Sequence, residues 1–78
     1  MTRDVVLYVA EGCHLCERAR ATLVGEGVEF REVDITGDPS LEERYREWLP
    51  VVEINGERAF VYYVDSAALR RKLARLSG

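Results

Sequence analysis

The chain has 78 residues, which predicts a single small domain spanning residues 1–78. Hydrophobic residues make up 47% and charged residues 32%, with a net charge of −3. This balance excludes a disordered polypeptide and does not supply the basic face that nucleic acid binding needs. No apolar run is long enough to span a bilayer, and the first residues lack the pattern of a signal peptide. We therefore expect a cytoplasmic, monomeric protein without nucleic acid or membrane partners.

The first half of the chain predicts a strand, a helix and a second strand. Residues 4–9 (DVVLYV) form a continuous apolar run rich in β-branched residues, which is typical of a buried strand. Residues 13–26 carry apolar side chains at helical spacing and end in glycines that suit a helix C-terminus. Residues 28–35 (VEFREVDI) predict another strand, whose alternation slips by one residue, as at a bulge or a sheet edge.

A second helix is expected over residues 38–49. Asp38 is a typical N-cap residue, and Pro39 suits the first helical position. The apolar side chains of this helix recur at helical spacing, which predicts one buried face. The residues of that face are Leu41, Tyr45 and Trp48.

The last third of the chain predicts a hairpin and a closing helix. Asn55 and Gly56 separate two strand-like runs, residues 51–54 (VVEI) and 58–63 (RAFVYY), and Asn-Gly is the strongest short-range hairpin signal. The closing helix begins after a cap at Asp65 or Ser66. The order βαβαββα implies a parallel first pair of strands with a right-handed crossover, followed by two antiparallel strands. We expect an α/β fold with a four-stranded mixed sheet and helices on both faces.

Cys13 and Cys16 are the only cysteines, and they enclose the only histidine, His14. A structural zinc site needs four ligands, so one chain does not supply it, although a metal shared between two chains stays open. A static disulfide over so short a loop adds little stability. If both cysteines were inert core residues, both would lie on the apolar face of the helix, but only Cys16 falls on that face.

A redox dithiol fits the position of the motif best. The pair follows a buried strand and opens a helix within a βαβ unit, the setting in which Cys-x-x-Cys indicates thiol exchange. At the helix N-cap, Cys13 would meet free backbone N–H groups and the positive end of the helix dipole, which stabilise a thiolate. Cys13 is therefore the predicted nucleophile. Cys16, one turn later and more buried, is the predicted resolving thiol.

At this point the sequence resembles a glutaredoxin-like protein of the thioredoxin superfamily, over essentially the whole chain. The resemblance is carried by LYVAEGCHLC, EFREVDIT, LPVVEINGE and a closing helix, and it points to a divergent, short bacterial branch with a C-H-L-C motif. It implies a thioredoxin-like fold of the glutaredoxin type and a thiol–disulfide oxidoreductase activity without a bound cofactor. It also places Pro50 where the superfamily carries a cis-proline facing the active site. The residues that fall on glutaredoxin positions are Tyr8, Gly12, Cys13, Cys16 and Ala19.

The sequence departs from glutaredoxins where they hold glutathione. Ala10 and Glu11 stand where glutaredoxins usually carry a lysine, and His14-Leu15 replaces their Pro-Tyr. Before the closing helix, Tyr63 and Val64 occupy the expected place of two glycines, so bulk fills the space that glutathione would use. Asp65 remains and could hold the amino group of glutathione, but we expect its carboxylate to cap the closing helix instead. Glutathione is therefore expected only as a weak reductant.

The expected substrate is a disulfide in a protein or a small thiol compound, with electrons from a reductase or from glutathione. His14 and Pro50 are expected to support catalysis, although His14 could equally be an exposed helix residue without a role. No metal ligands are predicted within one chain. A non-catalytic binding or adaptor domain, and a metal or cluster carrier built by two chains, stay open as alternatives. The predicted substrate-binding rim comprises Tyr8, Leu15, Leu49, Tyr63 and Asp65, with Trp48 near it.

Overall fold

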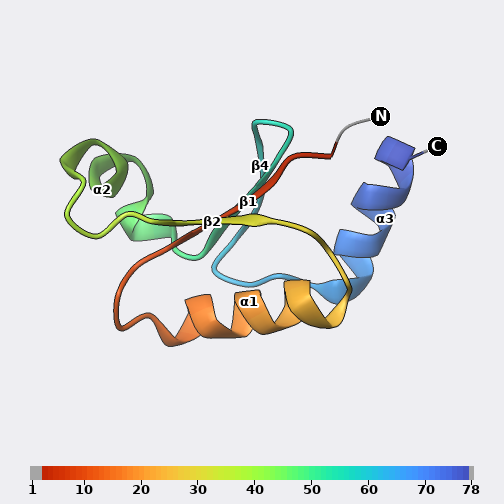
Figure 1. The fold of residues 1–78 in the computed structure, drawn as a ribbon, viewed down its shortest axis with the longest axis horizontal. Helices are drawn as coiled ribbons and strands as arrows, with labels where there is room; N and C mark the ends of the chain where they lie inside the picture. Colours follow the sequence, from red (N-terminus) through yellow and green to blue (C-terminus); the bar gives the residue numbers. More distant parts are fainter. Residues whose placement is uncertain (1–2, 78) are drawn as a thin grey trace.

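The computed structural model describes residues 3–77, so residues 1, 2 and 78 of the expected domain lie outside the described part of the chain. The elements follow the predicted order, with one short 3-10 helix, η1, added after the second α-helix (Figure 1). Their bounds are β1 (Val5–Val9), α1 (His14–Gly25), β2 (Arg31–Asp34), α2 (Pro39–Tyr45), η1 (Arg46–Trp48), β3 (Val51–Ile54), β4 (Glu57–Val61) and α3 (Ser66–Ser77).

The four strands form one mixed sheet in the order β2-β1-β3-β4. β1 pairs in parallel with β2 and antiparallel with β3, and β3 pairs antiparallel with β4. The β3–β4 hairpin turns at Asn55 and Gly56, whose φ values of 52° and 82° are both positive, as a tight hairpin turn requires. The predicted topology is confirmed.

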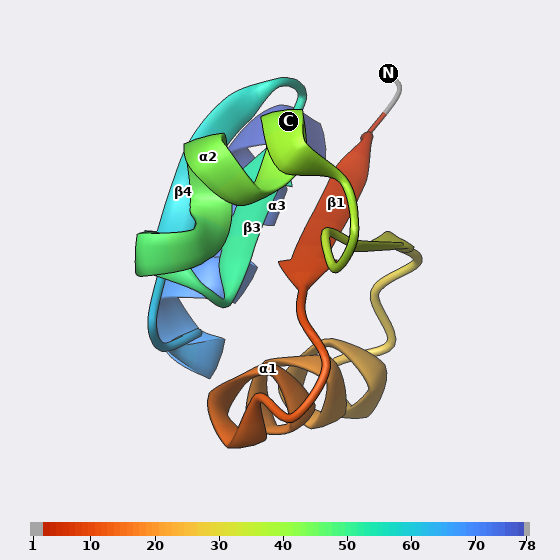
Figure 2. The ribbon, with the colours of Figure 1, turned by 90° about the vertical axis from the view of Figure 1, so that its left-hand side faces the viewer.

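Helices cover both faces of the sheet (Figures 1 and 2). On one face, α1 and α3 pack against the side chains of Val5, Leu7 and Val9, because alternate residues of β1 point the same way. On the other face, Tyr45 of α2 forms a smaller cluster with Ile35 and Val51. Tyr8 of β1 packs against this second cluster, so β1 contributes to the cores on both sides, which explains its continuous apolar sequence.

Three predicted segments begin or end at least two residues inside the bounds that the sequence indicated. β2 begins at Arg31 and is an edge strand, which accounts for the slip in its alternation, whereas the bulge lies at Val52/Glu53 in the hairpin. The second helix ends at Tyr45, and the chain continues through η1, which leaves Trp48 40% exposed rather than buried. β4 ends at Val61, before the two tyrosines that follow it.

The predicted helix caps are present. Asp38 precedes α2 and accepts a hydrogen bond from the Leu41 N–H at 3.2 Å. Asp65 Oδ2 accepts one from the Ala68 N–H at 2.9 Å at the start of α3. Within residues 3–77, no helix combines the length and the apolar character needed to cross a membrane.

Candidate active site

The two cysteines lie where β1 passes into α1. After β1, Gly12 takes a φ of +75°, which side chains rarely allow, and brings the chain to Cys13 at the N-cap of α1. Cys13 Sγ accepts a hydrogen bond from the Cys16 N–H at 3.1 Å, and the two residues form a disulfide with Cα atoms 5.2 Å apart. Cys13 is half-buried, whereas Cys16 is 1% exposed. The pair therefore has an outer and an inner sulfur.

His14 lies at the first position of α1 and points into solvent, with its side chain 97% exposed. Its Nδ1 is 3.9 Å from a carboxylate oxygen of Glu17, one turn along the helix. His14 therefore has the exposed helix position that the sequence analysis gave as the alternative to a role in catalysis. A supporting role for His14 in catalysis stays a prediction.

Pro50 lies at the same end of the sheet as the dithiol. The Leu49–Pro50 peptide bond is cis, as predicted, and the Pro50 ring is buried. Because β1 and β3 run antiparallel, β3 begins where β1 ends, next to the start of α1 (Figure 2). Leu49 and Cys13 also pack against the same hydrophobic cluster. The structure therefore brings Leu49 and Pro50 to the end of the molecule that carries the cysteines.

Exposed apolar side chains surround this end of the molecule. Leu15, from between the cysteines, is 46% exposed, and Tyr63, from the β4–α3 connection, is 68% exposed. Both line a small hollow of about 40 Å³ against α1, together with Tyr62. Leu15 and Tyr63 therefore share one surface. They are 48 positions apart in the sequence, and the sequence analysis predicted both in the substrate-binding rim.

Tyr62 belongs to this surface, and the sequence analysis missed it. Its φ is +66°, a conformation in which glycine is common and a bulky residue is rare, so nothing in the local sequence indicates it. Val64 is the opposite case. It is 3% exposed and packs in the core, so Tyr62 and Tyr63, rather than Tyr63 and Val64, occupy the surface before Asp65.

Tyr8 lies on the α2 face of the sheet. Its ring stacks on Tyr45 with centroids 4.0 Å apart, and its hydroxyl donates to a Glu53 carboxylate oxygen at 3.3 Å. The Tyr45 hydroxyl donates to the other oxygen at 2.8 Å. Burial, followed by its bonds with Tyr8 and Glu53, raises the pKa of Tyr45. Tyr8 thus joins α2 to the sheet, and its role in substrate binding stays a prediction.

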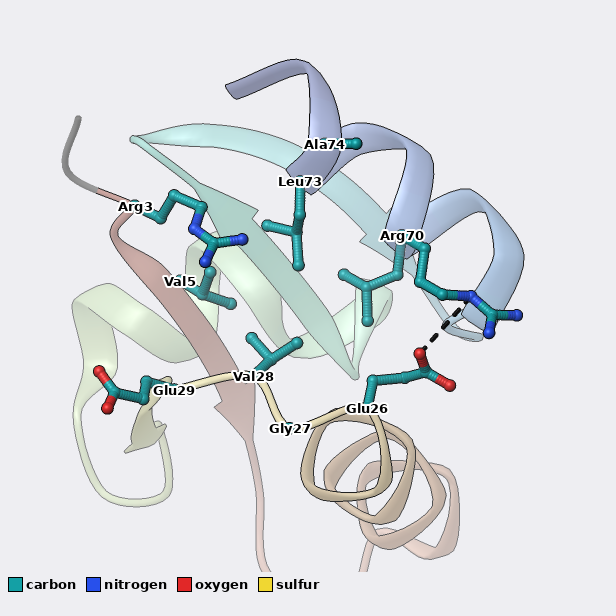
Figure 3. A pocket seen from close by; sticks show the side chains of 10 residues that line it. Arg3, Val5, Glu26, Gly27, Val28, Glu29, Arg70, Leu73 and Ala74 are labelled. Carbon is teal, nitrogen blue, oxygen red and sulfur yellow. Dashed lines mark ion pairs between the residues drawn. The ribbon is translucent and has the colours of Figure 1, made fainter. Parts of the chain in front are cut away.

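No group of three or more His, Cys, Asp or Glu side chains that could hold a metal ion is present within residues 3–77. A separate hollow of about 800 Å³ lies between the start of β1, the C-terminal end of α1 and α3 (Figure 3). Val5, Val28 and Leu73 point into it, and an ion pair of 3.5 Å between Glu26 and Arg70 borders it. It lies at the end of α1 remote from the cysteines.

Residues 4–74 match the family model described as a glutaredoxin-like domain. The target protein XcR50 from X. campestris has a similar structure, with a TM-score of 0.80 and 30% identity over 91% of this chain and 96% of that chain. Protein Ne2328 from Nitrosomonas europaea gives 0.75 and 29% over 92% of each chain. A comparison with curated proteins found no match.

A more distant likeness concerns the fold alone. Glutaredoxin 1 from Francisella tularensis, in a structure complexed with cacodylate, has a TM-score of 0.63 and 17% identity over 96% of both chains. The mixed sheet, the helices on both faces and the paired cysteines agree with the resemblance drawn from the sequence. The chain belongs to the glutaredoxin-like domain family and has a thioredoxin-like fold.

Proposed function

We propose that the protein is a thiol–disulfide oxidoreductase in which Cys13 is the nucleophile and Cys16 the resolving thiol. One observation carries the proposal, namely the difference between the two cysteines. Cys13 is the partly exposed N-cap of α1, and its sulfur accepts a hydrogen bond from the Cys16 N–H. Cys16 is 1% exposed and forms the disulfide with Cys13. An outer sulfur at a helix N-terminus is reachable and has N–H donors for its anion, whereas an inner sulfur reacts only with its neighbour.

The reaction would proceed in two exchanges. The Cys13 thiolate attacks one sulfur of the substrate disulfide, so a Cys13 mixed disulfide forms and the other substrate sulfur leaves as a thiolate that takes up a proton. The Cys16 thiolate then attacks Cys13 Sγ, which forms the Cys13–Cys16 disulfide and releases the second substrate thiol. Two electrons have passed to the substrate, and an external dithiol or two thiols reduce the protein again.

Protein disulfides, or those of small thiol compounds, are the proposed substrates. Leu15 and Tyr63 supply an exposed apolar rim, and Leu49 lies just outside the strand pairs of β3, where its backbone could pair with an extended segment. The site offers glutathione fewer binding contacts than a glutaredoxin does. An exposed acidic residue, Glu11, stands in place of a basic residue, and Asp65 already caps α3. We propose that glutathione is a weak reductant and that the protein acts as a cytoplasmic monomer without a resident cofactor.

A comparison of two electron sources tests this function. The oxidised protein is supplied with NADPH and either thioredoxin reductase or glutathione with glutathione reductase, and the reduction of insulin and of a small mixed disulfide is followed. We expect turnover that depends on Cys13 and is inefficient with glutathione. The Cys13→Ser variant is the control, since it retains Cys16 but lacks the outer sulfur.

Three results would contradict the proposal in different ways. Efficient, saturable turnover with glutathione on the small mixed disulfide would indicate an ordinary glutaredoxin. A cysteine pair that neither source can cycle would favour a binding or adaptor domain. Stoichiometric metal in protein that is purified anaerobically as a dimer would favour a carrier formed by two chains.

A further inference from the structure

Tyr62 adopts a backbone conformation that is unusual for its size. Within residues 3–77, the non-glycine residues with positive φ are Asn55 and Tyr62. Asn55 lies in the hairpin turn and is of a type that tolerates this region, whereas a bulky aromatic residue is an outlier there. Such a conformation persists where the surrounding structure enforces it, and it often marks a functional constraint.

All of the unusual contacts of Tyr62 lead to one segment, Glu47–Pro50. Its backbone N–H donates to the Pro50 carbonyl at 3.0 Å and is shared with the Trp48 carbonyl at 3.4 Å. Its hydroxyl donates to the Glu47 carbonyl at 3.1 Å. Its ring lies against that of Trp48, with centroids 6.1 Å apart at 41°. Tyr62 therefore holds both ends and the middle of this segment at once.

In this conformation, with its positive φ, Tyr62 contacts the segment through both its backbone and its side chain. The backbone N–H points at Pro50, and the side chain of the same residue reaches back to Glu47, three positions earlier. Tyr62 is itself 47% exposed, so burial of its side chain does not account for the conformation. The hydrogen bonds to the segment and the contact with Trp48 therefore offset the unfavourable backbone conformation of Tyr62.

We propose that Tyr62 is a positioning residue, which fixes the segment Glu47–Pro50 as a preformed wall for a docking disulfide substrate. This inference rests on the proposed function. The reacting sulfurs are held by a different element, α1, through the N-cap bond of Cys13. Loosening the segment should therefore weaken substrate binding and leave the reactivity of Cys13 unchanged.

Two variants separate the contributions of Tyr62. Tyr62→Phe removes only the hydroxyl bond to Glu47. Tyr62→Gly removes the hydroxyl and the ring, but it suits the φ of +66°, so the fold is expected to persist. We expect KM for a disulfide-containing protein to rise about two- to tenfold in Tyr62→Phe, and further in Tyr62→Gly, with kcat within about twofold of wild type. Val24→Ala, an exposed change on α1, is the control.

Trp48 gives a readout that does not depend on activity, because it is the only tryptophan of the chain. Acrylamide quenching of its fluorescence should increase in Tyr62→Phe, which keeps the ring against Trp48 and loses only the hydroxyl bond to Glu47, so an increase there reports release of the segment. In Tyr62→Gly the loss of the ring that lies against Trp48 should add to the increase. The iodoacetamide reaction of reduced Cys13 should be unchanged.

The possible outcomes distinguish this inference from the proposed function. Unchanged quenching in Tyr62→Phe would overturn the positioning role, even with a raised KM, which would then indicate direct contact between Tyr62 and the substrate. A fall in kcat or in Cys13 alkylation with KM unchanged would overturn it as well. If the wild-type protein shows no turnover, the proposed function fails, and the substrate-docking role fails with it. Quenching in Tyr62→Phe would then still decide whether the hydroxyl of Tyr62 holds the segment.

Discussion

At the scale of single residues, the two cysteines differ in environment although they lie only three positions apart. Cys13 is the N-cap residue, is half-buried and accepts a hydrogen bond from a free helix N–H. Cys16 belongs to the same core cluster as Leu23 and is 1% exposed. Exposure and anion stabilisation both favour Cys13 as the reactive thiol, because the thiolate is the attacking species.

We expect the reduced cysteines to alkylate at very different rates. In Cys16→Ser, Cys13 should react with iodoacetamide with an apparent pKa below that of a free thiol, about 8.5, because the helix N-terminus stabilises its anion. In Cys13→Ser, Cys16 should react at least about tenfold more slowly at neutral pH, because it is buried. Rates measured from pH 5 to 10 provide the comparison.

The same variants unfolded in urea are the control, where both thiols should react alike. Equal and slow alkylation of the two folded variants, with the pH profile of a free thiol, would contradict the assignment of Cys13 as nucleophile. The profile of His14→Ala decides whether the exposed histidine supports the thiolate.

At the scale of elements, α1 carries both cysteines, and capping interactions define where this helix begins and where it ends. Its C-terminal end is closed by two backbone bonds of 3.0 Å, from the Gly27 N–H to the Val24 carbonyl and from the Val28 N–H to the Leu23 carbonyl. Gly27 has a φ of +69°, so this end forms the left-handed glycine cap that often terminates helices. The cap directs the chain toward β2.

Two glycines at this end should respond oppositely to the same substitution. Gly25→Ala is expected to stabilise the protein by about 0.4–1 kcal/mol, because Gly25 is helical and alanine restricts the unfolded chain. Gly27→Ala should destabilise it by about 1–2 kcal/mol, because the left-handed conformation is unfavourable for alanine. Urea denaturation measures both changes.

The pair is its own control, since an added Cβ finds open space at both positions. Steric clash therefore plays no part in the difference. Equal effects of the two substitutions would show that the backbone conformation at Gly27 is not what closes the helix.

At the scale of the whole molecule, β1 carries a core on each side, and α3 completes the larger one. Leu69 of α3 is 0% exposed and packs in the same cluster as Leu7 and Cys16. A chain of 78 residues has one small hydrophobic core for each face and little excess stability. The buried position of Cys16 thus depends on a helix that begins 50 residues later in the sequence.

Leu69→Ala should therefore cost about 2–5 kcal/mol, because it removes buried methyl groups and leaves a cavity. This is a large share of the total stability of a small domain. Thermal unfolding followed by circular dichroism measures the effect. We also expect Cys16 to become more reactive toward iodoacetamide, since the cluster that covers it is weakened.

Val24→Ala is the matched control, because Val24 is 64% exposed and its truncation should change stability by less than about 0.5 kcal/mol. A loss below about 1 kcal/mol in Leu69→Ala, or a loss in Val24→Ala as large as that in Leu69→Ala, would contradict the account of the core.

The sequence by itself was sufficient for features that depend on a few consecutive residues. Helix capping by Asp38 and Asp65 and the hairpin turn at Asn55 were predicted and are present, because each side chain or backbone conformation acts on its immediate neighbours. The N-cap position of Cys13 follows for the same reason. The cis bond before Pro50 was predicted from the family resemblance, since proline alone does not determine it.

Only the tertiary structure decided features that depend on partners far away in the chain. Tyr62 takes its positive φ beside a segment 12 to 15 residues earlier, and Tyr8 turns its hydroxyl to Glu53, 45 positions later. Val64 is buried and Trp48 exposed, although both are apolar. Burial and long-range hydrogen bonds exist only once strands and helices have assembled, so the local pattern that correctly predicted the caps carries no record of them.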